Sequence, residues 1–389
     1  MKKIILCLLI WFSFTTIAEC AALDQTENNH MLESVFADLS VDGVNDFVTA
    51  MNQEMDDPLP RLNLETLKNI LWQGGNFDLV KCSEFLFKKL FEELFKQISL
   101  MGKLLFLAVL CVLLQNLQNA FEKANVSLLA YSVCFSFLAV FAMRAFYDAI
   151  FLAVQTINHM VSFMEALLPL LITLLAGVGA ITSAALFSPL MLLTVGIVAT
   201  TVKHVVLPLL LLSAALECTN YLADRYRLTQ LTSLFKQAGM ITLAFLMVIF
   251  IGIVTIQGVA GSVTDGLTLR TAKFATSTFV PVVGKVFADT VELVMGASLM
   301  LKNAVGIFGV LIIGGVCLLP LLKLFSLVAV MKITGALIEP MGDSKMSQCL
   351  IGFGNNLLLI AGAVLTVALM FFLAITMIVM TGSAAVMLR

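Results

Sequence analysis

The stretch "GMITLAFLMVIFIGIVTIQGV" occupies residues 239–259 and decides the fold class. It contains no charged side chain, and its length matches the roughly 20 residues that cross the hydrocarbon core of a bilayer as a helix. A backbone in lipid must satisfy its own hydrogen bonds, which a helix does within one segment. We therefore predict a membrane-spanning helix here.

Similar apolar runs recur through most of the chain, which has 389 residues, 60% of them hydrophobic and only 12% charged. This composition predicts an all-α, polytopic helical membrane protein. Nothing in the net charge of −2 suggests binding to nucleic acid. We expect about nine spans, near residues 103–117, 126–143, 164–180, 185–202, 205–216, 239–259, 304–319, 321–337 and 357–381.

The first residues have the pattern of a signal peptide. Lys2 and Lys3 precede a short apolar core, and small residues follow at Ala18, Ala21 and Ala22. We predict a cleaved signal peptide over residues 1–22. The alternative is an uncleaved anchor helix, although the apolar core is short for a span and polar, acidic sequence follows it.

Residues 23–100 form the predicted exported N-terminal region, and residues 101–389 the multi-span membrane domain. Between Asp24 and Pro60 there is no Lys or Arg, and the many acidic residues predict a solvated leader. A predicted amphipathic helix follows over 77–98, with Phe87, Phe91 and Phe95 on one stripe. It could lie in the membrane interface or pack on a partner, and we favour the interface.

Span counting and the positive-inside rule place the loop after the fifth span in the cytoplasm and the N-terminal region outside. A possible tandem repeat relates residues 164–260 to residues 276–382. Pro169 and Pro208 are 39 residues apart, as are Pro281 and Pro320. Two similar membrane modules would explain this spacing, but leucine-rich segments also align by coincidence.

One long polar stretch, "VTDGLTLRTAKFATSTFVPVVGKVF" at 263–287, interrupts the apolar sequence. The bland interpretation is an amphipathic element on the membrane surface, and the functional one is a docking or conduit-lining element. Its candidate residues are Asp265, Arg270, Lys273, Phe274, Pro281, Gly284 and Lys285. Because the Gly284–Lys285 pair is followed by Val286, the pattern is not a phosphate-binding P-loop.

No arrangement of residues indicates catalysis, a cofactor or a metal. The three histidines, His30, His159 and His204, are scattered, and no nucleophile is accompanied by a base. We therefore predict a protein that is not an enzyme. Ionisable groups near spans are candidate intramembrane polar residues. These are Lys323, which could instead snorkel from a hairpin turn, and Glu165 and Glu217, which we expect at the interface.

Several motifs closely resemble the stage III sporulation protein AE family of endospore-forming bacteria, and the resemblance covers nearly the whole chain. They are "LLQNLQNAFEKANVS" (113–127), "VLPLLLLSA" (206–214), "DGLTLRTAKF" (265–274), "FVPVVGKVFADT" (279–290) and "LKNAVGIFGV" (301–310). The two motifs within the polar stretch are the most specific part.

The resemblance implies a multi-pass protein of the mother-cell membrane around the forespore. It implies a subunit of a channel or secretion-like complex that sustains the forespore and its late gene expression after engulfment. Implied partners are the other stage III sporulation A-operon membrane proteins, their ATPase, and a forespore membrane protein across the intermembrane space. No catalytic residue is carried over. The alternative function, which the possible repeat favours, is a self-sufficient small-molecule permease.

Overall fold

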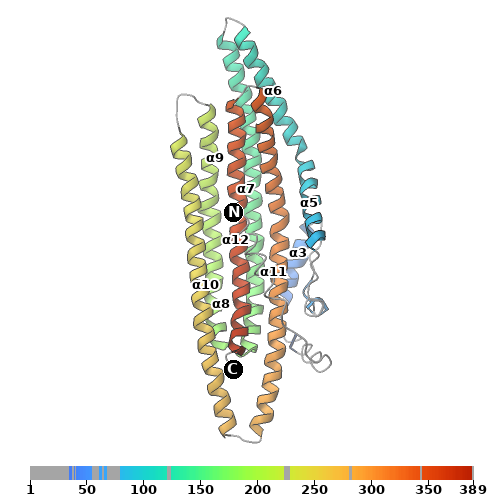
Figure 1. The fold of residues 1–389 in the computed structure, drawn as a ribbon, viewed down its shortest axis with the longest axis vertical. Coiled ribbons are helices and arrows are strands. Elements are labelled where there is room, and N and C mark those ends of the chain that lie inside the picture. The colour runs from blue at the N-terminus through green and yellow to red at the C-terminus, as the bar shows by residue number, and fades with distance from the viewer. Residues whose placement is uncertain are drawn as a thin grey trace.

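The protein is an elongated bundle of long helices (Figure 1). This computed structural model describes residues 35–36, 39, 41–54, 61–63, 65–67, 79–120, 124–222, 228–279, 283–341 and 344–387. Within those ranges there is no strand. The helices are α3 (Asp42–Glu54), α5 (Leu79–Lys96), α6 (Ile98–Ala120), α7 (Ala124–Gly177), α8 (Ile181–Thr201), α9 (Leu207–Leu222), α10 (Thr229–Phe279), α11 (Val283–Ile338) and α12 (Ser344–Met387), with a π-helix at Val202–Val206 and a 3₁₀ turn at Glu339–Met341.

The described part of the chain contains five helices that are long and apolar enough to cross a membrane, or six if the bent pair α5–α6 counts as one span. This confirms a multi-pass helical membrane protein and the predicted span at 239–259. The prediction of about nine spans is not confirmed. Predicted neighbours are joined: 126–143 and 164–180 both lie in α7, and 304–319 and 321–337 both lie in α11.

The joined helices are longer than one bilayer requires. A helix of 54 residues such as α7 is roughly 80 Å long, whereas the hydrocarbon core is about 30 Å thick. Arg144 and Asp148, which ended a span in the prediction, lie exposed in the middle of α7. These charged residues thus lie on an exposed side of a continuous helix and do not end it.

Proline does not interrupt these helices either. Pro320, which separated two predicted spans, lies inside α11, and Pro169 lies inside α7. Pro208 is the second residue of α9, directly after the π-helix at 202–206 that connects α9 to α8 without a break. Proline removes one backbone N–H and its ring crowds the carbonyl four residues earlier, and the wider π-turn relieves that crowding. The predicted spans 185–202 and 205–216 therefore form one continuous helical segment.

Helix α12 lies near the middle of the bundle, against α7, α9, α10 and α11 (Figure 1). Its most extensive contact is with α11, where one glycine lets these two helices approach closely and a second lets α11 approach α7. A Cβ at Gly306 would overlap the Val379 side chain, and one at Gly309 would overlap Leu167 of α7. In lipid the hydrophobic effect does not drive helices together. Small residues let the backbones approach closely, so that van der Waals contact can hold the helices together instead.

The described part of the predicted leader packs on the bundle, which differs from a solvated segment. Val44 and Val48 of α3 are buried, and the ring of Phe47 lies 5.2 Å from that of Phe163 in α7. The Asn45 side chain holds the segment at Leu62, donating to its carbonyl and accepting from its N–H. Val44, Val48 and Met51, spaced three or four residues apart, thus form one buried apolar face, while Asp42 and Asp46 are exposed. The predicted signal peptide lies outside the described residues.

Helix α5 falls within the predicted amphipathic segment, and its aromatic stripe is exposed while one of its acidic residues is buried. Phe87, Phe91 and Phe95 are exposed, whereas Glu93 is buried and accepts a hydrogen bond from Lys96 at 2.8 Å. The apolar stripe therefore points away from the bundle, as a lipid-facing stripe would. Its location in the membrane interface stays a prediction.

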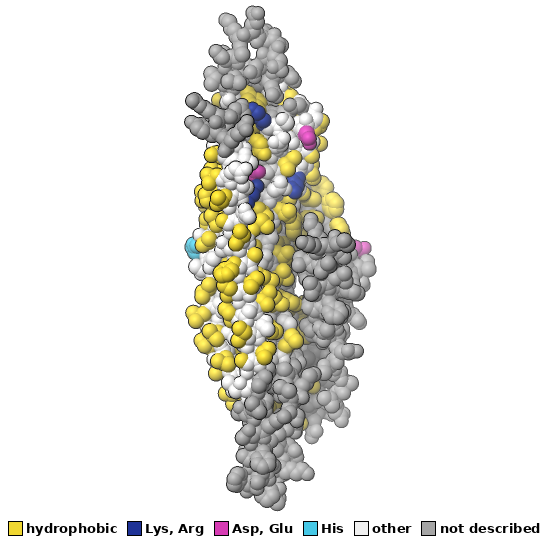
Figure 2. All heavy atoms as spheres, turned by 60° about the vertical axis from the view of Figure 1, so that its left-hand side comes forward, with side chains coloured by type: hydrophobic (Ala, Val, Ile, Leu, Met, Phe, Trp, Pro, Cys, Tyr) yellow, Lys and Arg dark blue, Asp and Glu magenta, His cyan; other side chains and the backbone are white. Residues whose placement is uncertain are grey.

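The side formed by α8, α9 and α10 is mostly hydrophobic over a long stretch, with its few charged side chains near one end (Figure 2). Exposed apolar residues on this side include Leu193 and Ile197 of α8 and Phe245, Val248 and Ile256 of α10. The tandem repeat also stays a prediction. Residues 164–260 hold α8, α9 and the π-helix between parts of α7 and α10, whereas residues 276–382 hold α11 and most of α12.

Candidate functional site

Asp265, the first candidate of the polar stretch, caps a distant helix. Its carboxylate accepts hydrogen bonds from the backbone N–H of Thr182 (2.9 Å to Oδ1) and Ser183 (3.1 Å to Oδ2), in the first turn of α8. The residue that precedes α8, Ala180, has no side chain able to do this. A buried carboxylate also complements the positive end of the helix dipole. Asp265 therefore ties α10 to the start of α8.

Two glycines allow this contact. Between α7 and α8 the chain reverses within three residues, and Gly179 has a φ of 89°, which L side chains rarely adopt. One turn before Asp265, a Cβ at Gly261 would overlap Ser183 Oγ and would lie 3.2 Å from Ser183 Cα. Gly261 therefore lets the backbones of α8 and α10 approach closely where the Asp265 cap forms.

Beyond Asp265, α10 and α11 continue past the rest of the bundle as a helical hairpin, seen at the bottom of Figure 1. We call residues 266–292 the projecting hairpin, and its end of the molecule the hairpin end. Arg270, Lys273 and Phe274 lie on its first arm, and Gly284 and Lys285 at the start of its second, whereas Pro281 lies outside the described residues. The side chains of these six candidates lie outside the described part of the structure.

Glu217 belongs to a hydrogen-bonded network between three helices. Its Oε2 accepts from Lys236 Nζ of α10 at 2.8 Å and from Asn356 Nδ2 of α12 at 2.7 Å. Asn356 Oδ1 accepts from Ser213 Oγ at 3.3 Å. A Cβ at Gly352 would lie 2.5 Å from Glu217 Oε1, so this glycine admits the carboxylate. We call these residues the Glu217 network. Its carboxylate is held between three helices, and its location at the membrane interface stays a prediction.

The other two candidate intramembrane residues are on the outside of the bundle. Glu165 and Lys323 are both exposed, on α7 and α11 respectively. Lys323 does not occupy a hairpin turn, because α11 continues through it from Val283 to Ile338. The structure brings neither residue near Asp265 or the Glu217 network in any described hydrogen bond or ion pair.

Sequence reasoning missed Lys302, which is 0% exposed. Its Nζ donates to the backbone carbonyl of Val379 in α12 at 2.8 Å. The lysine stands directly before an apolar run, and it was passed over because the predicted span began at Ala304. An ionisable residue within reach of a span was the signal that could have found it.

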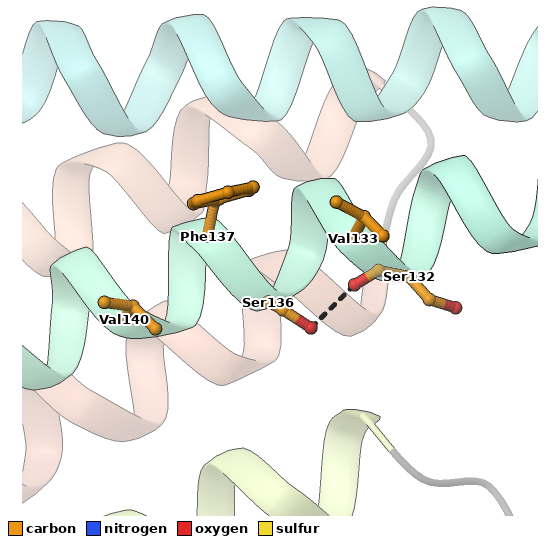
Figure 3. Close-up of a pocket in the computed structure, with 5 residues that line it drawn as sticks. All are labelled: Ser132, Val133, Ser136, Phe137 and Val140. Atoms are coloured by element: carbon orange, nitrogen blue, oxygen red, sulfur yellow. Dashed lines mark hydrogen bonds between the residues drawn. The ribbon is translucent and has the colours of Figure 1, made fainter.

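The hollow shown in Figure 3 does not form a binding site. It is lined by Ser132, Val133, Ser136, Phe137 and Val140, all from α7. The Ser136 hydroxyl donates to the Ser132 carbonyl at 2.8 Å, so its hydrogen goes to the helix itself. Among the described residues there is likewise no group of three or more His, Cys, Asp or Glu side chains that could hold a metal ion.

Comparison with known proteins places this fold in a family. The family model described as "Stage III sporulation protein AE" matches residues 63–382. The chain belongs to the stage III sporulation protein AE family. It is similar to the stage III sporulation protein AE of Bacillus subtilis (strain 168), with 35% identity over 371 residues, covering 94% of this chain and 93% of that relative. No solved structure matches.

Membership of the stage III sporulation protein AE family confirms the resemblance found in the sequence and implies a role in sporulation. The matched region includes the Asp265 cap, the projecting hairpin, Lys302 and the Glu217 network.

Proposed function

We propose that the protein is a non-enzymatic membrane subunit of a channel or secretion-like complex between mother cell and forespore. Its partners would be the other stage III sporulation A-operon membrane proteins, their ATPase and a forespore membrane protein. It would lie in the mother-cell membrane around the forespore, with its N-terminal region outside the cytoplasm. Family membership and the multi-pass helical fold support this role.

The observation that carries a docking role is the projecting hairpin itself. A pair of helices that continues past its bundle presents surface to other molecules, and a buried carboxylate directly before it fixes where the projection starts. The sequence puts Arg270, Lys273 and Lys285 on this element. We infer that these cations contact acidic groups of a neighbouring subunit.

Sporulation of the host tests the role. Deleting the gene should arrest development after engulfment, with shrinking forespores and loss of heat-resistant spores, and restoring the intact gene should reverse both. A restored triple variant with Arg270→Glu, Lys273→Glu and Lys285→Glu should lose at least about 100-fold in heat-resistant spores at normal protein level. The matched control is Arg144→Glu, an exposed cation far along α7, which should sporulate normally.

Normal spores from the deletion strain would overturn the proposed role. The permease alternative would then be tested with purified protein in liposomes, where a subunit that needs partners should move no solute alone. Orientation has its own test: protease added to intact protoplasts should digest the region of residues 24–100, and complete protection would contradict the proposed extracytoplasmic N-terminal region.

A further inference from the structure

The buried face of α10 changes character along its length. It is apolar at Leu246, Phe250 and Val254 and then carries Gln257 and, two turns later, Asp265. Gln257, Gly261 and Asp265 follow one another at intervals of four residues and therefore lie on the same side of the helix. The change occurs in the turns that precede the projecting hairpin. Polar residues thus replace hydrophobic ones on the buried face of α10 where it approaches this end.

The neighbouring helices contribute individual buried polar residues at the same level, among apolar ones such as Leu301 and Ile378. Ser183 of α8 faces Gly261, and Thr381 Oγ1 of α12 lies 3.7 Å from where a Cβ at Gly258 would be. On the other side of α12, Lys302 of α11 donates to Val379, and Ser298 Oγ lies 3.0 Å from the position of a Cβ at Gly177. We call this set the polar end layer: Ser183, Gln257, Asp265, Ser298, Lys302 and Thr381, each of them buried.

Several atoms in or beside this layer have no hydrogen-bond partner. In the described part of the chain, four buried side-chain polar atoms are unpaired: both amide atoms of Gln257, Ser183 Oγ and Asn303 Oδ1. The first three belong to the polar end layer, and Asn303 is next to Lys302 in α11. Gln257 is only 6% exposed and Ser183 is 0% exposed, so bulk solvent cannot pair them by simple contact. The Glu217 network contains none of these unpaired atoms.

Buried polar groups in folded proteins almost always have hydrogen-bond partners, from protein or from internal water. Water occupies an interior site when two to four polar groups surround it, and dry cavities are lined by apolar groups. Further acceptors lie at the level of Gln257 and Ser183: the Asp265 carboxylate, which keeps lone pairs beyond its two hydrogen bonds from α8, and the Thr381 oxygen, whose hydrogen goes to the Met377 carbonyl. An apolar side chain at position 257, such as leucine, would have continued the apolar face of α10. We therefore infer that the Gln257 amide does more than fill space in the bundle.

We propose that the polar end layer is a hydrated site inside the bundle, which takes water and small hydrogen-bonding solutes at its hairpin end. Gln257 and Ser183 bind them directly, through an amide that both donates and accepts and a hydroxyl that does the same. Asp265 positions Ser183 by holding the first turn of α8. The inference deepens the proposed channel role, because it places the contact with a polar solute on this chain.

Thiol accessibility tests the inference on the full-length purified protein. The native cysteines are first replaced by alanine or serine, and single cysteines are then introduced as Gln257→Cys, Ser183→Cys and Val254→Cys. The probe is a small cationic methanethiosulfonate reagent that dissolves in water but not in lipid. Val254, which is 2% exposed and lies on the same face of α10, is the matched control.

We expect Gln257→Cys and Ser183→Cys to react at least tenfold faster than Val254→Cys. Equal rates at the three positions would overturn the hydrated site. A second variant, Gln257→Leu, gives an independent readout: in a hydrated layer it leaves the melting temperature unchanged or lowers it, whereas a rise of several degrees would show a dry interior. Both readouts are made without sporulation, so a failed sporulation test and a failed labelling test remain distinguishable.

Discussion

The Glu217 network and the polar end layer place polar side chains inside the same bundle in opposite ways. In the Glu217 network, a carboxylate, an ammonium and an amide from three helices satisfy one another. In the polar end layer, one carboxylate is satisfied by the first turn of α8, while an amide and a hydroxyl nearby are unpaired. The comparison separates polar groups that join helices from polar groups that have no hydrogen-bond partner within the described part of the protein.

This contrast has a physical basis. When one partner of a buried ion pair is removed, the other charge stays buried without compensation, which lowers the stability of the fold strongly. A network whose members all pair with one another therefore stabilises one arrangement of the helices. An unpaired amide gains nothing from the helices around it, so its removal costs little unless water or a solute binds it. We therefore expect large stability effects in the Glu217 network and smaller ones in the polar end layer.

The largest effect should come from Glu217→Ala. The substitution leaves Lys236 and Asn356 without their shared acceptor, and breaking a largely buried pair of this kind should cost about 3 kcal/mol in the free energy of unfolding. The side chains of Glu217 and Lys236 are only 18% and 24% exposed, so solvent screens the pair weakly. Denaturant unfolding in detergent micelles measures the loss.

A double variant controls this prediction. Glu217→Leu combined with Lys236→Leu removes both charges and should recover much of the stability lost by either single change. If the single and double changes simply add, the two side chains do not interact and the network would not join α9 to α10.

The next effect should come from Gly261→Ala, because the new Cβ would overlap Ser183 and push α8 away from α10. Overpacking of this kind costs about 1–3 kcal/mol. Gly252→Ala is the matched control in the same helix, where nothing lies within 4 Å of the new Cβ. It should be neutral or slightly stabilising, since alanine favours a helix over glycine by about 1 kcal/mol. Equal melting temperatures for the two variants would contradict the close approach at the Asp265 cap.

Loss of the cap itself should be smaller. Asp265→Ala removes both acceptors from the first turn of α8, and the loss of an N-cap costs roughly 0.5–2 kcal/mol. Asp265→Asn keeps one acceptor oxygen and should retain about half of the stability that Asp265→Ala loses. Thermal unfolding of the three proteins in the same detergent measures the order. An Asp265→Ala protein as stable as the parent would show that α8 does not depend on this carboxylate.

The smallest effects should come from the two exposed candidates. Glu165→Gln and Lys323→Gln change side chains on the outer surface of α7 and α11, and surface substitutions usually stay within about 0.5 kcal/mol. Thermal unfolding should show both close to the parent protein. A loss of stability comparable to that of Glu217→Ala would contradict this prediction, because it would mean that the exposed residue makes a stabilising contact.

The helical membrane class followed from composition, and the position of the span at 239–259 was predicted well because uncharged apolar sequence leaves few alternatives. The number of spans was not predicted well, because polar residues such as Arg144, and one proline, Pro320, were taken as the ends of spans. Arg144 lies on an exposed side of a continuous α7, and the crowding at Pro208 is relieved by a π-turn. Local sequence does not reveal whether a helix tolerates such a residue, since tolerance depends on its neighbours.

For the candidate residues too, the sequence predicted part of the result and the tertiary structure decided the rest. The sequence singled out Asp265 in the polar stretch and Glu217 as an ionisable residue near a span. It could not name Thr182, Ser183 or Asn356 as their partners, because those contacts join positions far apart in the chain. Lys302 was missed for a related reason: its burial depends on α12 lying against α11.

By itself the sequence determined that this chain is a multi-pass helical membrane protein, because hydropathy is a property of the chain alone, and its motifs showed the resemblance to a sporulation family that the comparisons confirm. The tertiary structure decided which polar groups are paired. Hydrogen bonds act over about 3 Å, and only the packing of α8, α9, α10 and α12 brings Asp265 to the first turn of α8 and Glu217 to Lys236 and Asn356.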